Sequence, residues 1–140
     1  MDNEKTVLLE RNEIPNEYKW DLEAMYENNE LWEEDFKKVK VLADEIEVFK
    51  GKTVESSSNL LKVLVLKDEL YKLTYNVFGY ARMRSDEDSR NSTYQALTDR
   101  AMGLAALVQA KTSFIIPEIL ALDESEMEKY ISEEKDLEVY

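Results

Sequence analysis

The chain has 140 residues, of which 44% are hydrophobic and 35% are charged, and its formal net charge is −13. This length and composition are typical of a single soluble helical unit, and the acidic balance disfavours binding to nucleic acid or to anionic membranes, because like charges repel. The sequence contains no His and no Cys, the residues most often used for zinc binding, thiol chemistry and disulfide frameworks.

We expect a cytoplasmic location. The first residues, MDNEKTVLLERNE, lack the basic and apolar regions of a signal peptide. No uninterrupted apolar run approaches the roughly 18 residues of a membrane span. The lack of Cys also fits a reducing compartment.

Residues 1–28 are predicted to form an extended arm rich in aromatic side chains. Asp21 is placed to cap a short helical turn. Tyr18, Trp20 and Tyr26 are too large to leave in water at low cost, so we expect all three to pin this arm to the helices that follow.

Residues 29–140 are predicted to form a helical lobe whose first helix runs from about Glu30 to Val48. Asn29 is the expected N-cap and Gly51 the expected stop. Apolar residues at spacings of three and four place one face of this helix in a core. They are Trp32, Phe36, Val39, Ala43 and Ile46.

The second helix is predicted over about Asn59–Arg84, after a serine linker at residues 56–58 that supplies the N-cap. It carries an unbroken apolar stripe, widened on one flank, which indicates contact with more than one neighbour. The stripe comprises Val63, Leu66, Leu70, Leu73, Val77 and Tyr80.

The third helix is predicted over about Ser92–Ile116, with Pro117 ending or kinking it. Lys111 falls on its apolar stripe, so this side chain must reach water or meet a carboxylate. The stripe comprises Tyr94, Leu97, Ala101, Leu104, Val108 and Ile115.

A fourth helix is predicted to open near residues 123–125, where Ser125 and Glu128 have the spacing of a capping box. Asp136 is a further candidate N-cap, but the four residues after it are too few to form a helix. We therefore expect a lobe truncated at the start of a fifth helix.

The expected fold is all-α: an antiparallel hairpin of the long second and third helices, with the other helices and the arm packed on it. The polar corner between the two long helices holds five residues that are candidates for contact with a ligand or with another part of the protein. These are Tyr80, Arg82, Arg84, Asp86 and Asp88.

Two functional interpretations of this corner compete with simple ion pairing. A calcium loop starting at Asp86 would need Gly and Glu where the chain has Asn91 and Leu97, so that motif fails. Arg82 and Arg84 could bind a carboxylate or a peptide terminus. Ion pairs with Asp86, Asp88 or Asp99 are the favoured alternative, and no catalytic or metal-binding residue is assigned.

Ordered short motifs run along the chain from Arg11 to its end. They are Arg11 with Ile14-Pro15; Tyr18-x-Trp20-Asp21-Leu22; Tyr26 and Trp32; Phe49-x-Gly51-Lys52; Tyr80-Ala81-x-Met83-x-x-Asp86-Glu87-Asp88; Asn91-x-x-Tyr94-Gln95-Ala96-Leu97; Arg100-Ala101; Ser113-Phe114-Ile115-x-Pro117-Glu118-Ile119-Leu120; and Asp136-Leu137 with Tyr140. Together they resemble the N-terminal region of oligoendopeptidase F, a zinc peptidase of the thimet-oligopeptidase-like M3 family.

The resemblance implies a helical parent protein whose two lobes close over a channel and cleave short peptides. In that family zinc is held by an H-E-x-x-H helix and a further Glu, and none of these residues can be carried over to this chain. The resemblance therefore implies that this chain is the non-catalytic lobe that helps wall the channel. Its implied partners are the catalytic domain of the same polypeptide and, in the parent, oligopeptide substrate.

A second hypothesis comes from the width of the apolar stripe on the second helix. A free-standing helical interaction module, or a gene remnant without peptidase activity, would bury that surface in a partner or a second copy. A defined dimer at low concentration would favour this alternative.

Overall fold

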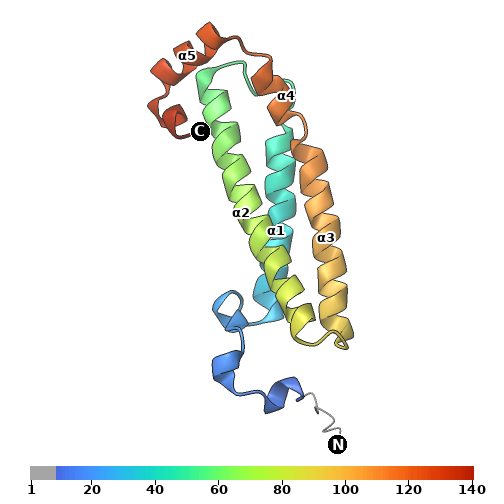
Figure 1. The fold of residues 1–140 in the computed structure, drawn as a ribbon. Helices are drawn as coiled ribbons and strands as arrows, with labels where there is room; N and C mark the ends of the chain where they lie inside the picture. The colour runs from blue at the N-terminus through green and yellow to red at the C-terminus, as the bar shows by residue number, and fades with distance from the viewer. Residues whose placement is uncertain (1–8) are drawn as a thin grey trace, which may run out of the picture.

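The structure is a computed structural model that describes residues 9–140, and those residues contain helices and no strands (Figure 1). The α-helices are α1 (Asn29–Glu47), α2 (Ser57–Glu87), α3 (Ser92–Thr112), α4 (Ile115–Leu120) and α5 (Glu124–Glu133). The prediction of an all-α fold is confirmed.

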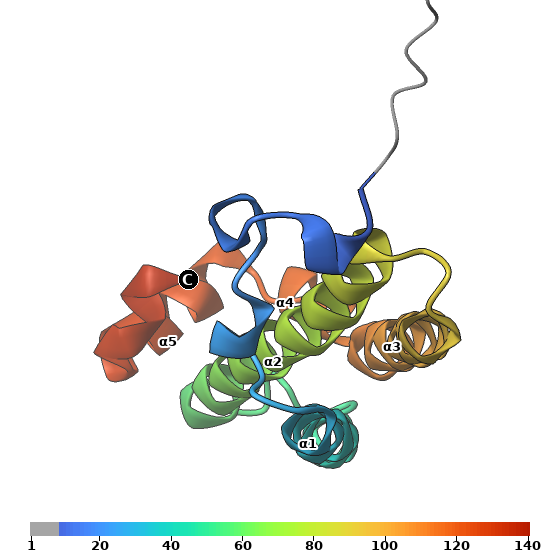
Figure 2. The same ribbon diagram turned by 90° about the horizontal axis from the view of Figure 1, so that it is seen from below.

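The three long helices pack against one another, as the view along their axes shows (Figure 2). Two hydrogen bonds at opposite ends show that α2 and α3 run antiparallel. The hydroxyl of Thr98 donates to the carbonyl of Ala81 at 3.0 Å, and the hydroxyls of Tyr71 and Thr112 lie 3.0 Å apart.

A single apolar core joins α1, α2 and α3. Trp32 is fully buried in it, and its indole N–H donates to the carbonyl of Val77 at 2.8 Å. Val63, Leu70 and Val77 of the predicted stripe are completely buried. Each such side chain stabilises the fold by roughly 1.5–3 kcal/mol relative to exposure.

Two predicted helix starts need adjustment. Asn28, and not Asn29, caps α1, since its side chain accepts a hydrogen bond from the backbone of Leu31 at 3.0 Å. Asn29 instead accepts a bond from the hydroxyl of Tyr80 at 3.2 Å. Ser56 caps α2 and lies within the predicted serine linker.

The prediction that Pro117 ends or kinks the third helix is wrong. α3 ends earlier, at Thr112, whose hydroxyl donates back to the carbonyl of Val108 at 2.8 Å. Pro117 is the third residue of α4, where a backbone N–H has no partner within the helix and its loss costs little.

The predicted capping box at Ser125 and Glu128 is also wrong. Asp123 accepts from the backbone of Glu126 at 2.9 Å, and the carboxylate of Glu126 accepts from the backbone of Asp123 at 3.3 Å. A short 3-10 helix, Lys135–Val139, follows α5 and buries Leu137.

The arm is pinned by fewer aromatic residues than predicted. It contains the 3-10 helices Arg11–Glu13, Asn16–Tyr18 and Leu22–Ala24, and its first eight residues lie outside the described part of the chain. Tyr26 is buried with Leu22, but Tyr18 and Trp20 are 75% and 55% exposed. The arm therefore contacts the helices through its last residues and, as described below, through ion pairs.

The loop between α1 and α2 is held by a carboxylate from α4. Gly51 has a φ of +78°, a left-handed conformation that favours glycine. The carboxylate of Glu118 accepts hydrogen bonds from the backbone N–H of Gly51 at 2.5 Å and of Thr53 at 3.0 Å. Two segments that carry the family resemblance, at residues 49–52 and 117–120, thus meet in one structural contact.

Lys111 of α3 meets carboxylates, as its position on the apolar stripe predicted. Its ammonium group lies 2.7 Å from Asp44 and 2.5 Å from Glu47, both on α1. These partners raise the pKa of Lys111, so its charge is kept at the edge of the core.

Within the described residues, Ser92–Leu120 is long and apolar enough to cross a membrane by length and composition alone. This segment corrects the expectation that the chain has no membrane-span candidate. That expectation relied on an uninterrupted apolar run, and charged residues such as Arg100 and Lys111 interrupt this segment. In the structure this segment is divided between α3 and α4, and α3 packs on α1 and α2.

Candidate functional site

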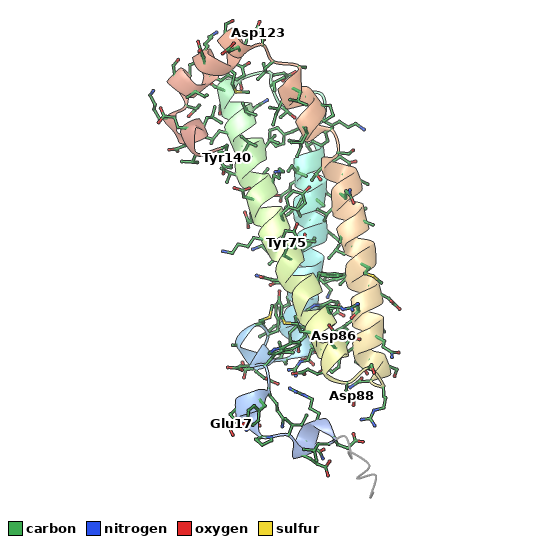
Figure 3. The ribbon with its side chains drawn as sticks, viewed as in Figure 1. Glu17, Tyr75, Asp86, Asp88, Asp123 and Tyr140 are labelled. Carbon is green, nitrogen blue, oxygen red and sulfur yellow. The ribbon has the colours of Figure 1, made fainter. Side chains whose placement is uncertain are left out.

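The predicted contact residues lie where α2 turns into α3, beside the arm. Figure 3 shows Asp86 and Asp88 at this end of the three-helix bundle, and Asp123 and Tyr140 toward the other. Tyr80 is 1% exposed, and its ring meets that of Tyr26 edge-on, with centroids 5.2 Å apart. Tyr80 therefore supports this site from inside the core.

Arg84 is the central cation of the site. Its guanidinium lies 5.2 Å from the ring centre of Tyr80 and 5.7 Å from that of Tyr94. It donates to Glu23 of the arm at 2.6 Å and to Glu87 of α2 at 3.3 Å. The hydrogen bond from Arg84 holds the pKa of Glu23 below its ordinary value.

Glu87 connects Arg84 to a second arginine. Its side chain is only 6% exposed, and its other carboxylate oxygen pairs with Arg11 of the arm. The row Glu23–Arg84–Glu87–Arg11 therefore alternates in charge and crosses twice between the arm and α2. Buried charges are tolerated in proteins when they are paired in this way.

A second group of ion pairs holds the arm to the α2–α3 turn. The guanidinium of Arg90 donates to Asp88 at 3.0 Å and to Glu10 of the arm at 3.0 Å. Hydrogen bonds from Arg90 lower the pKa of both Glu10 and Asp88. Arg90 and Glu10 are largely exposed and Asp88 is partly exposed, so salt will weaken their attraction.

Arg82 stands apart from Arg84. It points to solvent and pairs with Asp86, one helical turn away, at 3.2 Å. Both arginines therefore form ion pairs, but Arg84 does so with Glu23 and Glu87 and not with the aspartates that the sequence suggested.

An open polar hollow of about 700 Å³ lies between the arm and the helix turn. Its lining combines acidic, basic and amide side chains with one half-exposed indole. The lining residues are Glu10, Arg11, Asn12, Asn16, Lys19, Trp20, Asp21, Glu23 and Asp88. Such a surface can offer hydrogen bonds and charge to a polar ligand.

An apolar groove of about 440 Å³ lies at the opposite end, between the start of α2 and the segments α4 and α5. Lys67 is the one charged residue in its lining. The apolar lining residues include Leu60, Leu64, Ile116, Ile119, Met127, Ile131 and Leu137.

Sequence reasoning missed the arm's part in this site. The missed partners are Glu10, Arg11, Glu23, Glu87 and Arg90. Arg90 and Glu10 are eighty residues apart in the chain, and charged residues on an arm of short 3-10 turns have no sustained periodicity that could reveal a distant partner. In residues 9–140, no group of three or more acidic side chains is placed to hold a metal ion.

Curated relatives of this chain are bacterial peptidases. Oligopeptidase PepF of Bacillus subtilis is 34% identical over 133 residues, and Group B oligopeptidase PepB of Streptococcus agalactiae is 32% identical over 130 residues. The matches cover 95% and 93% of this chain. Over nearly its whole length, this chain is similar to one region of the oligoendopeptidase F proteins. A plasmid-encoded oligoendopeptidase F of Lactococcus lactis is also similar, at 29% identity over 93% of the chain.

The family match concerns one region of much longer proteins. The chain spans 20% of the Bacillus relative and 22% of the other two. Neither a protein-family model nor a solved structure matches it. The shared region is therefore a part of an oligopeptidase-like protein, with the helical structure described above.

Proposed function

We propose that this chain is the N-terminal, non-catalytic region of a cytoplasmic zinc oligoendopeptidase that hydrolyses short peptides. The observation that carries the proposal is the contrast in coverage: 95% of this chain matches PepF, but only 20% of PepF is matched. The catalytic domain would then lie in the remaining part of the same polypeptide and would be the chain's principal partner.

The residues of this region do not fit a zinc site. The sequence has no His or Cys, and the described carboxylates form no metal-binding group. Zinc ligands and the general base would come from the catalytic domain, so no chemical step is assigned to this chain.

The region would serve as a wall of the substrate channel. The polar hollow beside Asp88 supports this role, since it combines both signs of charge with an exposed indole, which suits the termini and side chains of a short peptide. Arg82 and Asp86 lie exposed near it and are available for the same purpose, whereas Arg84 and Tyr80 are engaged in holding the arm and the core.

The test is a peptidase assay on two proteins: the complete product of the reading frame that contains this chain, and the 140-residue chain alone. The complete product should cleave short quenched-fluorescent peptides and should lose that activity with a zinc chelator. The 140-residue chain should show none in the presence of zinc. A complete product that binds no peptide and cleaves none would contradict the proposal.

The second candidate function is a free-standing interaction module. It is favoured by the apolar groove and by exposed apolar surface on α2, which a partner could cover. Tyr75, which widens the apolar stripe of α2 on one flank and is labelled in Figure 3, has an exposed fraction of 72%. The neighbouring helices therefore leave part of that flank open. A stoichiometric dimer of the 140-residue chain at sub-micromolar concentration would support this candidate, and a monomer would count against it.

A further inference from the structure

The outer face of α3 is unlike the outer faces of the other long helices. The residues farthest from the core are small, and two larger apolar residues flank them, Met102 at 48% and Leu107 at 37% exposure. The small residues are Ala96, Gly103, Ala106 and Ala110, all exposed. We refer to these six residues as the outer α3 face.

Charge is sparse on this face, where the exposed Asp99, one helical turn before Gly103, is the charged residue. The charged residues of α3 are Asp99, Arg100 and Lys111. Arg100 pairs with Glu33 at 2.8 Å, and Lys111 pairs with carboxylates of α1. Between them the chain runs from residue 101 to residue 110 without a charge, although 35% of the whole sequence is charged. A helix face meant for water would carry charged side chains, as that of α1 does.

Nothing within the described residues requires a glycine at position 103. A methyl group in its place would meet no other atom within 4 Å, and its backbone is not in the left-handed region. Glycine inside a helix is less stable than alanine, so an ordinary exposed position would favour alanine. A glycine there is explained if another backbone approaches α3 closely.

A membrane is a poor occupant of this face. Only 28% of the most apolar window of Ser92–Leu120 is buried, so much apolar surface is open. However, Arg100 and Lys111 tie α3 to the charged helix α1, which would have to enter the lipid with it. A second copy of the chain is disfavoured as well, because two surfaces with a net charge of −13 repel each other.

We propose that the outer α3 face packs against another helix of the same, longer polypeptide, with closest approach at Gly103. The inference rests on the proposed function and deepens it by naming the surface that meets the remainder of the protein. The relatives are about five times longer than the matched region, so the parent has ample chain to supply this helix. Its contacting face should be apolar and uncharged, as in permanent interfaces.

The test compares Gly103→Leu and Ala106→Glu in the complete protein and in the 140-residue chain. In the 140-residue chain both positions face water, so neither variant should lower Tm by more than about 2 °C. In the complete protein the same changes should lower the temperature of half-inactivation by about 5 °C or more, because they overfill or charge a packed interface. Glu34→Leu on the exposed side of α1 is the matched control, with no shift expected in either protein.

The outcomes separate this inference from the proposed function. If the complete protein is a peptidase but tolerates both α3 variants, the inference is overturned and the proposed function stands. If the 140-residue chain co-floats with vesicles of phosphatidylcholine and phosphatidylglycerol and Ala106→Glu abolishes that, the face is a membrane surface and the inference is also overturned. If no longer protein exists, both fail together.

Discussion

Individual residues of this chain have structural roles within several of the motifs that resemble oligoendopeptidase F. Gly51 takes a left-handed backbone conformation, and Glu118 accepts hydrogen bonds from the backbone of Gly51 and Thr53. Trp32 donates its N–H to a buried carbonyl on α2. These roles are structural, which agrees with a region that positions other parts of an enzyme.

Substituting the two glycines tests the backbone argument. Gly51→Ala should destabilise the chain by about 1 kcal/mol, because a side chain disfavours the left-handed conformation. Gly103→Ala, in an open helical position, should stabilise the 140-residue chain by about 0.5–1 kcal/mol. Urea unfolding measures both, and equal effects of the two substitutions would contradict this account of the loop.

Glu118→Gln tests the carboxylate that holds the same loop. Burial alone would raise the pKa of Glu118, but hydrogen bonds from Thr53 and Gly51 outweigh it and lower the pKa below the ordinary 4.5. Loss of the charge should cost about 1–2 kcal/mol at pH 7. Glu128→Gln, at an exposed position of α5, is the control and should change the unfolding free energy by less than about 0.5 kcal/mol.

The two arginines of the site should differ in their effect on stability. Arg84 is 11% exposed and contacts Glu87, which is 6% exposed, so Arg84→Ala should cost about 2–3 kcal/mol by leaving a buried carboxylate with one partner fewer. Arg82→Ala breaks a solvent-exposed pair and should cost less than about 0.5 kcal/mol. Thermal unfolding of each single variant distinguishes them, and a larger loss for Arg82→Ala would be inconsistent with the geometry.

At the level of elements, the sequence predicted the long helices well because each has a continuous apolar stripe. Helix ends were less predictable, because several adjacent residues can serve as caps: Asn28 was used in place of Asn29, and Asp123 in place of Ser125. The arm was the least predictable element. Its contacts are ion pairs with residues far away in the chain, which leave no periodic signal.

Because of its ion pairs, the attachment of the arm to the helices should depend on pH. Hydrogen bonds from Arg84 and Arg90 lower the folded-state pKa of Glu23 and Glu10 below the ordinary 4.5. The stabilisation is therefore fully present above about pH 4.5 and is lost as the pH falls through the lower folded-state values. The amides of Met25 and Tyr26, which donate to Leu22, should lose hydrogen-exchange protection in that range.

The exchange experiment has an internal reference. Amides at the centre of α2, corrected for the intrinsic effect of pH on exchange, should stay protected at pH 3.5, because the core there is apolar. Added salt at pH 7 should weaken protection of the arm in the same direction. Equal loss of protection in the arm and in α2 would mean that the ion pairs do not hold the arm independently of the helical core.

For the whole molecule, the structure and the relatives point to a part of a larger protein. The three-helix bundle is complete in its core, yet it leaves open the outer α3 face and an apolar groove between α2, α4 and α5. The match covers nearly all of this chain and about one fifth of each relative. We therefore expect the chain to act as a rigid, non-catalytic lobe attached to a catalytic domain.

The most direct test of this account is the DNA sequence that follows the codon for Tyr140. The account predicts that the reading frame continues for several hundred codons and encodes an H-E-x-x-H motif, which would supply the chemistry absent from this region. A stop codon directly after Tyr140 would contradict it. The chain would then be a separate helical protein, and its apolar groove would be the first place to look for a partner.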